Sequence, residues 1–157
     1  MKLTKLGFTL TELLAVVLII GILTAIALPQ YRRSVSRSDA MTAMVNLRTI
    51  FDSAKRYKAA NSEAPKKLQG LDVSFFDASS DTSEKFNLGK FQYAFSDSVI
   101  SACRINGNYC FNFYYNHKTY GKDTLTCSFT RGGKYDWLCE NMGNSRIDGK
   151  DEFLMKG

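Results

Sequence analysis

The stretch Gly7-Phe8-Thr9-Leu10-Thr11-Glu12 stands at the head of an apolar run that continues to Pro29. The run decides the fold, because it has the length and composition of a membrane span. After Glu12, no charged residue occurs before Arg32, so the segment 13–31 holds 19 uncharged residues. A helix needs about 20 apolar residues to cross the hydrocarbon core of a bilayer. The sequence therefore predicts a membrane-spanning helix over about 13–31.

Glu12 is the one ionisable residue near the start of this apolar segment. Placing an acidic group at the centre of a membrane helix costs about 2.5–3.5 kcal/mol, and less toward the end of the helix. A charged partner would share the desolvation cost that an isolated carboxylate bears alone. We therefore interpret Glu12 as a candidate functional residue.

The segment 7–29, GFTLTELLAVVLIIGILTAIALP, together with a short basic leader, resembles the class III signal of type IV pilins and type II secretion pseudopilins. The resemblance implies that residues 1–7 are a leader peptide, which a prepilin peptidase removes between Gly7 and Phe8. It implies that Phe8 is then N-methylated. It also implies that Glu12 pairs with the Phe8 amine of a neighbouring subunit.

The helical pattern continues beyond the apolar run. Apolar residues recur at steps of three and four along one face, at Ala40, Ala43, Met44, Leu47, Ile50, Phe51, Ala54 and Tyr57. This spacing is typical of an amphipathic helix with one buried face. We expect one long helix over 8–60, with a kink or local opening at Pro29, because proline has no N–H and clashes with the preceding turn.

Residues 61–157 are predicted to form a globular head. Residues 61–90 read as a connecting region, and apolar residues then alternate with polar ones at every second position. This alternation predicts antiparallel strands over 91–95, 111–115 and 125–130, and a fourth over 135–139. Asn106-Gly107 is a strong signal for a two-residue hairpin turn, and Gly132-Gly133 is a second candidate. The predicted fold class is α+β, a long N-terminal helix on a small antiparallel sheet.

All four cysteines, Cys103, Cys110, Cys127 and Cys139, lie in the predicted head. An even set in an oxidising compartment predicts two disulfides. A turn at Asn106-Gly107 would place Cys103 opposite Cys110, and a turn at Gly132-Gly133 would bring Cys127 within one position of Cys139. The pairing Cys127–Cys139 also resembles the C-terminal disulfide loop of many pilins. These two bonds are favoured, and the other two connectivities remain open.

The charged residues exclude several function classes. The net charge is +6, with a cluster at Arg32, Arg33 and Arg37 that we expect near lipid headgroups. No recognised basic-aromatic motif accompanies it, so nucleic acid is not an expected partner. His117 is the single histidine, and no C-x-x-C motif occurs, so zinc binding, thiol catalysis and enzymatic activity in general are not expected. No cofactor is expected.

Two acidic runs are the remaining candidates for cation binding. Neither run fits EF-hand spacing: one holds Asp77, Asp81 and Glu84, and the other holds Asn144, Asp148, Asp151 and Glu152. The resemblance to major pseudopilins, which carry a C-terminal calcium site, keeps the second run as a candidate beside a solvated loop. Four tyrosines are candidates for a subunit interface or an adhesive patch: Tyr109, Tyr114, Tyr115 and Tyr120.

The resemblance implies a structural subunit of a type IV pilus-like filament. The expected partners are other copies and related pilins, the prepilin peptidase and N-methyltransferase, an inner-membrane assembly platform, and lipid before assembly. The expected location is the bacterial inner membrane with the head outside the cytoplasm, then an extracellular or periplasmic filament. The alternatives are a pseudopilin that drives protein export, a minor pilin that binds DNA or a surface, and a secreted domain cut after Ala25-Ile26-Ala27.

Overall fold

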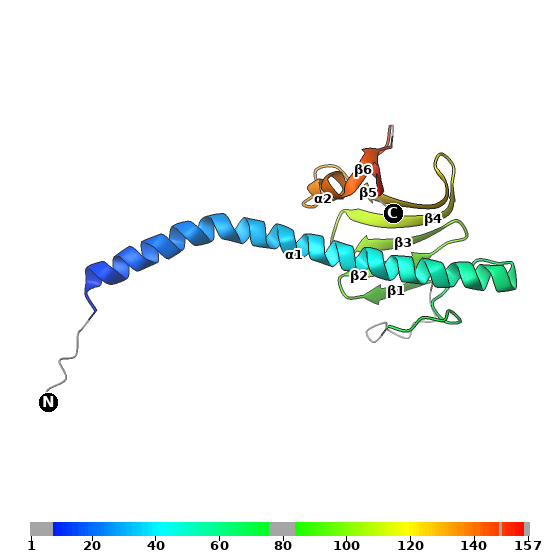
Figure 1. Cartoon of the computed structure of the whole chain (residues 1–157), viewed down its shortest axis with the longest axis horizontal. Helices are drawn as coiled ribbons and strands as arrows, with labels where there is room; N and C mark the ends of the chain where they lie inside the picture. Colours follow the sequence, from blue (N-terminus) through cyan, green and yellow to red (C-terminus); the bar gives the residue numbers. More distant parts are fainter. Residues whose placement is uncertain (1–7, 76–83, 148, 156–157) are drawn as a thin grey trace, which may run out of the picture. The chain divides into compact units, whose positions relative to one another are not determined.

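The computed structural model describes residues 8–75, 84–147 and 149–155. Within these ranges the chain forms a long helix, α1 (Leu10–Asn61), then seven strands and a short helix, α2 (Asp136–Met142) (Figure 1). The long helix predicted over 8–60 is confirmed. The chain divides between Ser38 and Asp39 into two compact units, so α1 contributes its first part to one unit and its last part to the other.

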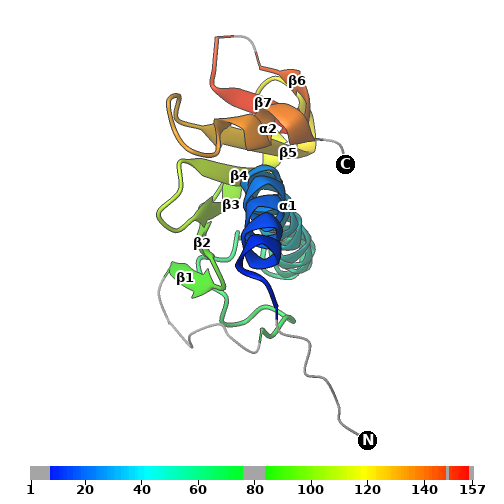
Figure 2. The ribbon, with the colours of Figure 1, turned by 90° about the vertical axis from the view of Figure 1, so that its left-hand side faces the viewer.

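The second unit contains a seven-stranded antiparallel sheet in the order β1-β2-β3-β4-β5-β7-β6 (Figure 2). Consecutive strands from β1 to β5 are neighbours, whereas β7 lies between β5 and β6. The strands are β1 (Lys85–Leu88), β2 (Phe91–Phe95), β3 (Val99–Arg104), β4 (Tyr109–His117), β5 (Gly121–Phe129), β6 (Gly143–Arg146) and β7 (Glu152–Met155). The α+β fold predicted from the sequence is confirmed.

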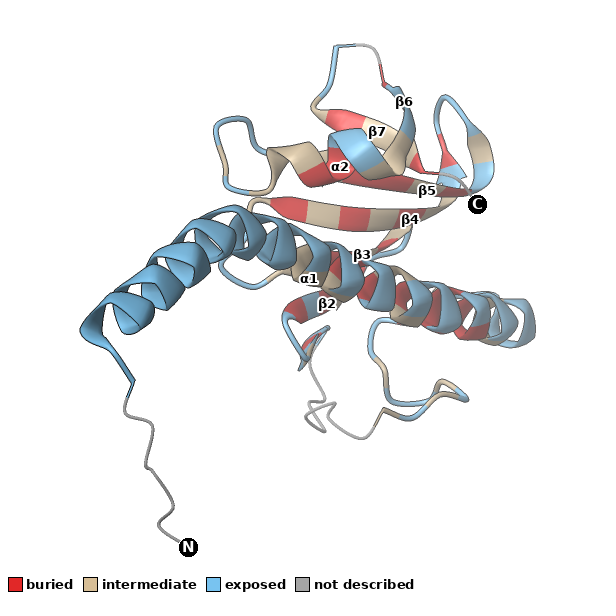
Figure 3. Ribbon diagram, turned by 60° about the vertical axis from the view of Figure 1, so that its left-hand side comes forward, coloured by how far each residue is buried: buried red, intermediate tan, exposed pale blue. Residues whose placement is uncertain are grey.

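The last part of α1 covers one face of this sheet with its apolar stripe (Figure 3). The Phe51 ring stacks on Phe113 of β4 with ring centroids 3.9 Å apart. Truncating a buried phenylalanine to alanine typically costs about 3–5 kcal/mol, so this contact is a main anchor of α1 to the sheet. The stripe agrees with the predicted one, since its buried members are Ala40, Ala43, Leu47, Ile50, Phe51 and Ala54.

Ion pairs fix both ends of the head part of α1 to the sheet. At the first end, the Asp39 carboxylate accepts from Lys90 Nζ at 2.8 Å and from Arg104 Nη1 at 3.4 Å. At the other end, Lys55 Nζ lies 2.5 Å from the Asp123 carboxylate of β5. The register of α1 on the sheet is therefore set by apolar packing in the middle and by charge at the two ends.

The hairpin predicted at Asn106-Gly107 is confirmed. It joins β3 to β4, and Cys103 lies directly opposite Cys110. Asn106 adopts a positive φ of 56°, which asparagine tolerates better than most residues. A Cβ on Gly107 would lie 2.7 Å from the Arg104 side chain, so the close approach of the two strands requires glycine there.

The fourth strand predicted over 135–139 is wrong, because this segment belongs to helix α2. Gly132-Gly133 is accordingly no hairpin turn between two strands. The Asp136 carboxylate accepts the backbone N–H groups of both glycines, which curls the chain just before the helix. Leu138 and Cys139 are then buried on one side of α2, as a helical turn allows and an alternating strand does not.

The strand β3 was implied only by the predicted turn at Asn106-Gly107, and three further strands lie where the sequence predicted none. β1 falls inside the region 61–90, which was interpreted as a connection, and β6 and β7 form a C-terminal hairpin. β1, β6 and β7 have only four residues each, too short for a clear alternation.

Tyr109 was a candidate for a subunit interface or an adhesive patch, which requires an exposed side chain. Tyr109 is instead buried, since it is 2% exposed and packs against Phe91 and Phe111.

Candidate functional site

The described part of the N-terminal unit consists of Phe8, Thr9 and the first part of α1. Its large apolar side chains between Leu13 and Leu28 are 45–64% exposed. Within the described ranges, α1 is a helix long and apolar enough to cross a membrane, judged by length and composition. Contiguous apolar surface of this extent marks a site of contact with lipid or with other protein.

Glu12 and Thr9 bind each other at the start of α1. Glu12 Oε2 accepts hydrogen bonds from the Thr9 backbone N–H at 2.9 Å and from Thr9 Oγ1 at 2.8 Å. The Glu12 backbone N–H donates to Thr9 Oγ1 at 3.3 Å. This reciprocal arrangement is a capping box, which satisfies amide groups that a helix start leaves unpaired. A threonine three residues before a glutamate is the sequence signal of this motif, although the cap itself was not predicted.

The carboxylate of Glu12 also lies at the end of the helix where negative charge is favoured, because the backbone dipoles give the N-terminus partial positive charge. Phe8 is next to this site and is 81% exposed. Gly7, the other residue at the predicted cleavage point, lies outside the described residues. Cleavage, methylation and the pairing of Glu12 with a neighbouring Phe8 remain predictions.

Pro29 lies within α1, and the helix continues through it without a break. The local opening predicted there is therefore absent from the described helix, and a kink remains a prediction. The Thr24 hydroxyl donates to the Ile20 carbonyl at 2.7 Å, a bond that satisfies the hydroxyl within the helix. Glu12 and Pro29 lie apart along one helix, so the structure does not bring them together in one site.

The four cysteines form the two favoured bonds, Cys103–Cys110 and Cys127–Cys139. The first bond lies across the β3–β4 hairpin, and its Cα atoms are 4.0 Å apart. The second joins β5 to α2, with Cα atoms 5.5 Å apart, and both of its cysteines are fully buried. The second bond therefore fastens α2 to the core of the head.

Asn108 is a structural residue that sequence reasoning missed. Its Nδ2 donates to the Thr130 carbonyl at 2.7 Å and to Asp136 at 2.5 Å, and its Oδ1 accepts from Tyr135 N–H at 3.3 Å. These bonds join the start of β4 to the loop before α2. They connect residues more than 20 positions apart in sequence, so no local sequence pattern predicts them.

The C-terminal acidic run is engaged with protein groups where it is described. Asp151 Oδ1 accepts from Arg131 Nε at 2.6 Å and from Arg146 Nη2 at 2.8 Å. Glu152 is buried and accepts from the Thr126 hydroxyl. Asp148, like Asp77 and Asp81, lies outside the described residues. Among the residues described, no group of three metal-ligand side chains comes together.

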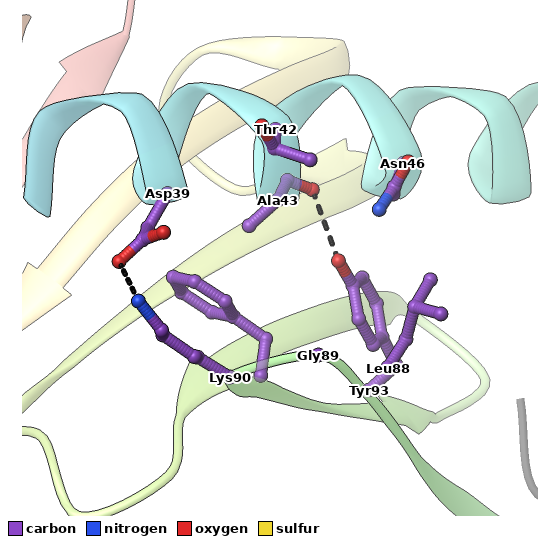
Figure 4. Close-up of a pocket in the computed structure, with 9 residues that line it drawn as sticks. Asp39, Thr42, Ala43, Asn46, Leu88, Gly89, Lys90 and Tyr93 are labelled. Carbon is purple, nitrogen blue, oxygen red and sulfur yellow. Dashed lines mark hydrogen bonds and ion pairs between the residues drawn. The ribbon is translucent and has the colours of Figure 1, made fainter. Parts of the chain in front are cut away.

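A groove of about 330 Å³ lies between α1 and the β1–β2 turn (Figure 4). Tyr93 forms part of its wall and donates from its hydroxyl to the Ala43 carbonyl at 3.4 Å. Burial raises the pKa of Tyr93 to about 12, which keeps the phenol protonated. Asp39 at the rim is bound by Lys90 and Arg104. These polar groups hold α1 on the sheet.

Several known proteins are similar to this chain. The type IV major fimbrial protein FimA of Dichelobacter nodosus is 54% identical over 44 residues, 28% of this chain and 28% of that protein. The type IV major pilin protein PilA of Myxococcus xanthus is 45% identical over 51 residues, 32% of this chain and 23% of its own length. The type II secretion system core protein G of Aeromonas hydrophila is 31% identical over 67 residues, 43% of this chain and 47% of its length.

The chain thus spans between about a quarter and a half of the length of these relatives. No protein-family model matches it, and no solved structure matches it at a significant level. The names of the relatives describe pilins and a secretion-system core protein, which are structural components. In its apolar stem, its capped Glu12 and its N-terminal sequence, the chain is similar to type IV pilins and type II secretion pseudopilins.

Proposed function

We propose that this protein is a structural subunit of a type IV pilus-like filament, assembled through its N-terminal helix. One observation carries the proposal: an exposed, uncharged helical run follows a carboxylate that the helix start already holds in place. An apolar run of this length suits a lipid environment, and it equally suits a bundle of identical helices. A filament core offers the second environment.

The proposed mechanism begins with the subunit in the bacterial inner membrane, its head outside the cytoplasm. The prepilin peptidase removes residues 1–7 between Gly7 and Phe8, and the freed Phe8 amine is methylated. Glu12 then pairs with the Phe8 amine of a neighbouring copy at the assembly platform. A paired charge costs less in an apolar surrounding than an isolated one. The helices leave the lipid and bury the same apolar surface against one another, and Pro29 lets the stem adjust where it meets its neighbours.

A pseudopilin of a type II secretion system is the second candidate. The similarity to core protein G keeps it as a candidate, because that relative is by name a component of a type II secretion system. The two candidates predict different phenotypes when the gene is deleted. Loss of a pilin removes surface filaments, whereas loss of a pseudopilin leaves exported proteins in the periplasm. A minor pilin would be rare in sheared filaments, in which a major subunit dominates.

The first experiment is intact-mass and N-terminal peptide analysis of the protein from its native envelope and from the sheared surface fraction. We expect a chain that starts at Phe8, carries one added methyl group, and lacks the four hydrogens removed by two disulfides. A chain that starts at Leu28 has lost the stem and would overturn the filament proposal. A chain that still starts at Met1 would leave a plain membrane-anchored protein.

The second experiment tests Glu12 directly with the variant Glu12→Gln, which keeps the shape of the side chain and removes its charge. We expect normal membrane insertion and leader removal but few or no filaments in the sheared fraction. Glu63→Gln, at an exposed acid of the head, is the matched control and should assemble normally. Normal assembly of Glu12→Gln would remove the charge pair from the mechanism.

A further inference from the structure

The two disulfides of the head lie on opposite faces of its sheet. Phe113 of β4 packs against α1, and successive side chains of a strand point to opposite faces. Phe111 therefore lies on the face that α1 covers, and so does Cys127, which is directly opposite Phe111 in the register. Cys110 lies on the other face, together with its bonded partner Cys103.

The two bonds also differ in burial. Cys127 and Cys139 are both 0% exposed, whereas Cys103 and Cys110 are both half-buried. A thiolate must reach a sulfur of a disulfide in order to attack it, so access decides which bond exchanges. A reagent in solution therefore reaches the Cys103–Cys110 bond in the folded head, and reaches the Cys127–Cys139 bond only after the head opens.

The side chains beside the accessible bond leave it open to an anionic nucleophile. Gln92 of β2 is directly opposite Cys103, and Ser128 of β5 is directly opposite Cys110. Both neighbours are uncharged, and Gln92 is exposed. An approaching thiolate therefore meets no like charge at the two positions that are paired with the bond.

The β3–β4 hairpin keeps its register without this bond. Five residue pairs align β3 with β4, and each of these strands is also paired with a further strand, β2 or β5. The Gly107 N–H closes the turn by donating to the Arg104 carbonyl at 3.0 Å. After reduction, the thiols of Cys103 and Cys110 therefore stay opposite each other, on Cα atoms that are 4.0 Å apart in the bonded head, and the bond can close again.

We propose that Cys103–Cys110 is a thiol–disulfide exchange site, which a protein dithiol of the C-x-x-C class opens and closes while the head stays folded. One thiolate of the dithiol attacks a sulfur of the pair, the Sγ–Sγ bond breaks, and the other cysteine leaves as a thiolate. The second thiolate of the dithiol then displaces the first cysteine. Two electrons and two protons thus pass from the dithiol, which becomes a disulfide, to Cys103 and Cys110. The proposal does not depend on filament assembly.

The test is timed reduction of the full chain in detergent micelles with dithiothreitol, a small dithiol, followed by alkylation with iodoacetamide and peptide mass spectrometry. We expect Cys103 and Cys110 to be alkylated at least about tenfold faster than Cys127 and Cys139, because the second bond waits for the head to open. In urea above the unfolding transition, the two bonds should open at similar rates. Equal rates in the folded protein would overturn the proposal. A difference that persists unchanged in urea would not come from access and would overturn it as well.

The class of partner is tested with reduced thioredoxin, a C-x-x-C protein dithiol, in place of dithiothreitol. We expect it to open Cys103–Cys110 and to leave Cys127–Cys139 closed, with an unchanged pattern of amide hydrogen exchange in β4 and β5. A bond that dithiothreitol opens and thioredoxin does not would overturn exchange with a protein. Loss of protection across β4 and β5 would show that the head unfolds on reduction, and would overturn exchange in the folded head.

A charge placed beside the bond tests the route of approach. Gln92→Glu puts a negative charge opposite Cys103 and should slow reduction by dithiothreitol about two- to fourfold at low salt, because it repels the thiolate. Gln69→Glu makes the same change at an exposed position in the segment after α1 and should leave the rate unchanged. Equal rates for Gln92→Glu and the native protein would show that the thiolate does not approach across this face, and would overturn the site.

Discussion

Thr9 and Glu12 cap the start of α1 reciprocally: Glu12 Oε2 lies 2.8 Å from Thr9 Oγ1, and the Glu12 backbone nitrogen lies 3.3 Å from the same oxygen. The carboxylate that the proposed assembly requires is therefore already oriented within the single chain. Its hydrogen bonds also reduce the cost of placing it beside an apolar run. Thr9 is in this sense a positioning residue for Glu12.

Thr9→Ala should loosen the first turn of α1, because it removes the hydroxyl that accepts the Glu12 N–H and donates to the carboxylate. Loss of such a cap costs about 0.5–2 kcal/mol. We expect correspondingly faster hydrogen exchange of the amides of residues 10–13 in lipid nanodiscs. Thr24→Ala is the matched control, because its hydroxyl bonds within the helix, to the Ile20 carbonyl. Equal protection in the native protein and Thr9→Ala would show that the cap does not order the helix start.

The sequence allowed prediction of those elements whose determinants are local. The apolar run from Leu13 follows from composition alone, and the β3–β4 hairpin follows from two adjacent residues, Asn106 and Gly107. The buried stripe of α1 follows from a period that a single helix imposes. In each case the residues that fix the structure are neighbours in the chain, so their pattern can be read directly.

The failure at 135–139 has a different physical origin. That segment has the alternating apolar residues of a strand, but Asp136 binds the N–H groups of Gly132 and Gly133 and the side chain of Asn108. These contacts join segments that are distant in sequence and favour a helix at the position where the pattern alone favours a strand.

Gly133→Ala should destabilise the head. A Cβ at this position would lie 1.8 Å from Asn108 Nδ2, and Asn108 cannot move aside without breaking its bonds to Thr130 and Asp136. Overpacking of this kind costs about 1–3 kcal/mol, measured as a lower free energy of unfolding in urea. Gly21→Ala, where no atom lies within 4 Å of the new Cβ, is the control.

A double-variant cycle separates this contact from other causes. If the clash is with Asn108, then Gly133→Ala combined with Asn108→Ala should cost less than the sum of the two single changes. Strict additivity would mean that the alanine at 133 disturbs something else.

Asp151→Asn should weaken the C-terminal hairpin of β6 and β7. The change removes the charge that binds both Arg131 and Arg146, and because these groups are partly exposed we expect a loss of about 1 kcal/mol in unfolding free energy. Glu140→Gln, at an exposed acid of α2, is the matched control. Because Arg131 and Arg146 already form ion pairs with Asp151, adding calcium or a chelator should leave the melting temperature of the native protein unchanged. A calcium-dependent rise in melting temperature would place a cation in the run and contradict this expectation.

Asp72→Asn should change how the head responds to acid. Arg56 binds the Asp72 carboxylate through Nε at 2.8 Å and Nη2 at 2.9 Å, and the buried Ser53 hydroxyl donates to it as well. These bonds, first from Arg56 and then from Ser53, lower the pKa of Asp72 from 3.8 to about 2. A depressed pKa in the folded state means that the carboxylate stabilises the fold above the ordinary value, and that this stabilisation disappears as pH falls through the folded value.

We therefore expect native protein to melt at a higher temperature than Asp72→Asn near neutral pH, and the difference to close as pH falls from 3.8 to about 2. Melting followed by circular dichroism across this range measures it. Asp97→Asn, at an exposed acid after β2, tests whether any lost carboxylate gives the same result. A difference for Asp72→Asn that persists unchanged to pH 2 would mean that its ionisation is not linked to folding. The segment after α1 would then be held to the helix by the shape of the contact with Arg56 and not by its charge.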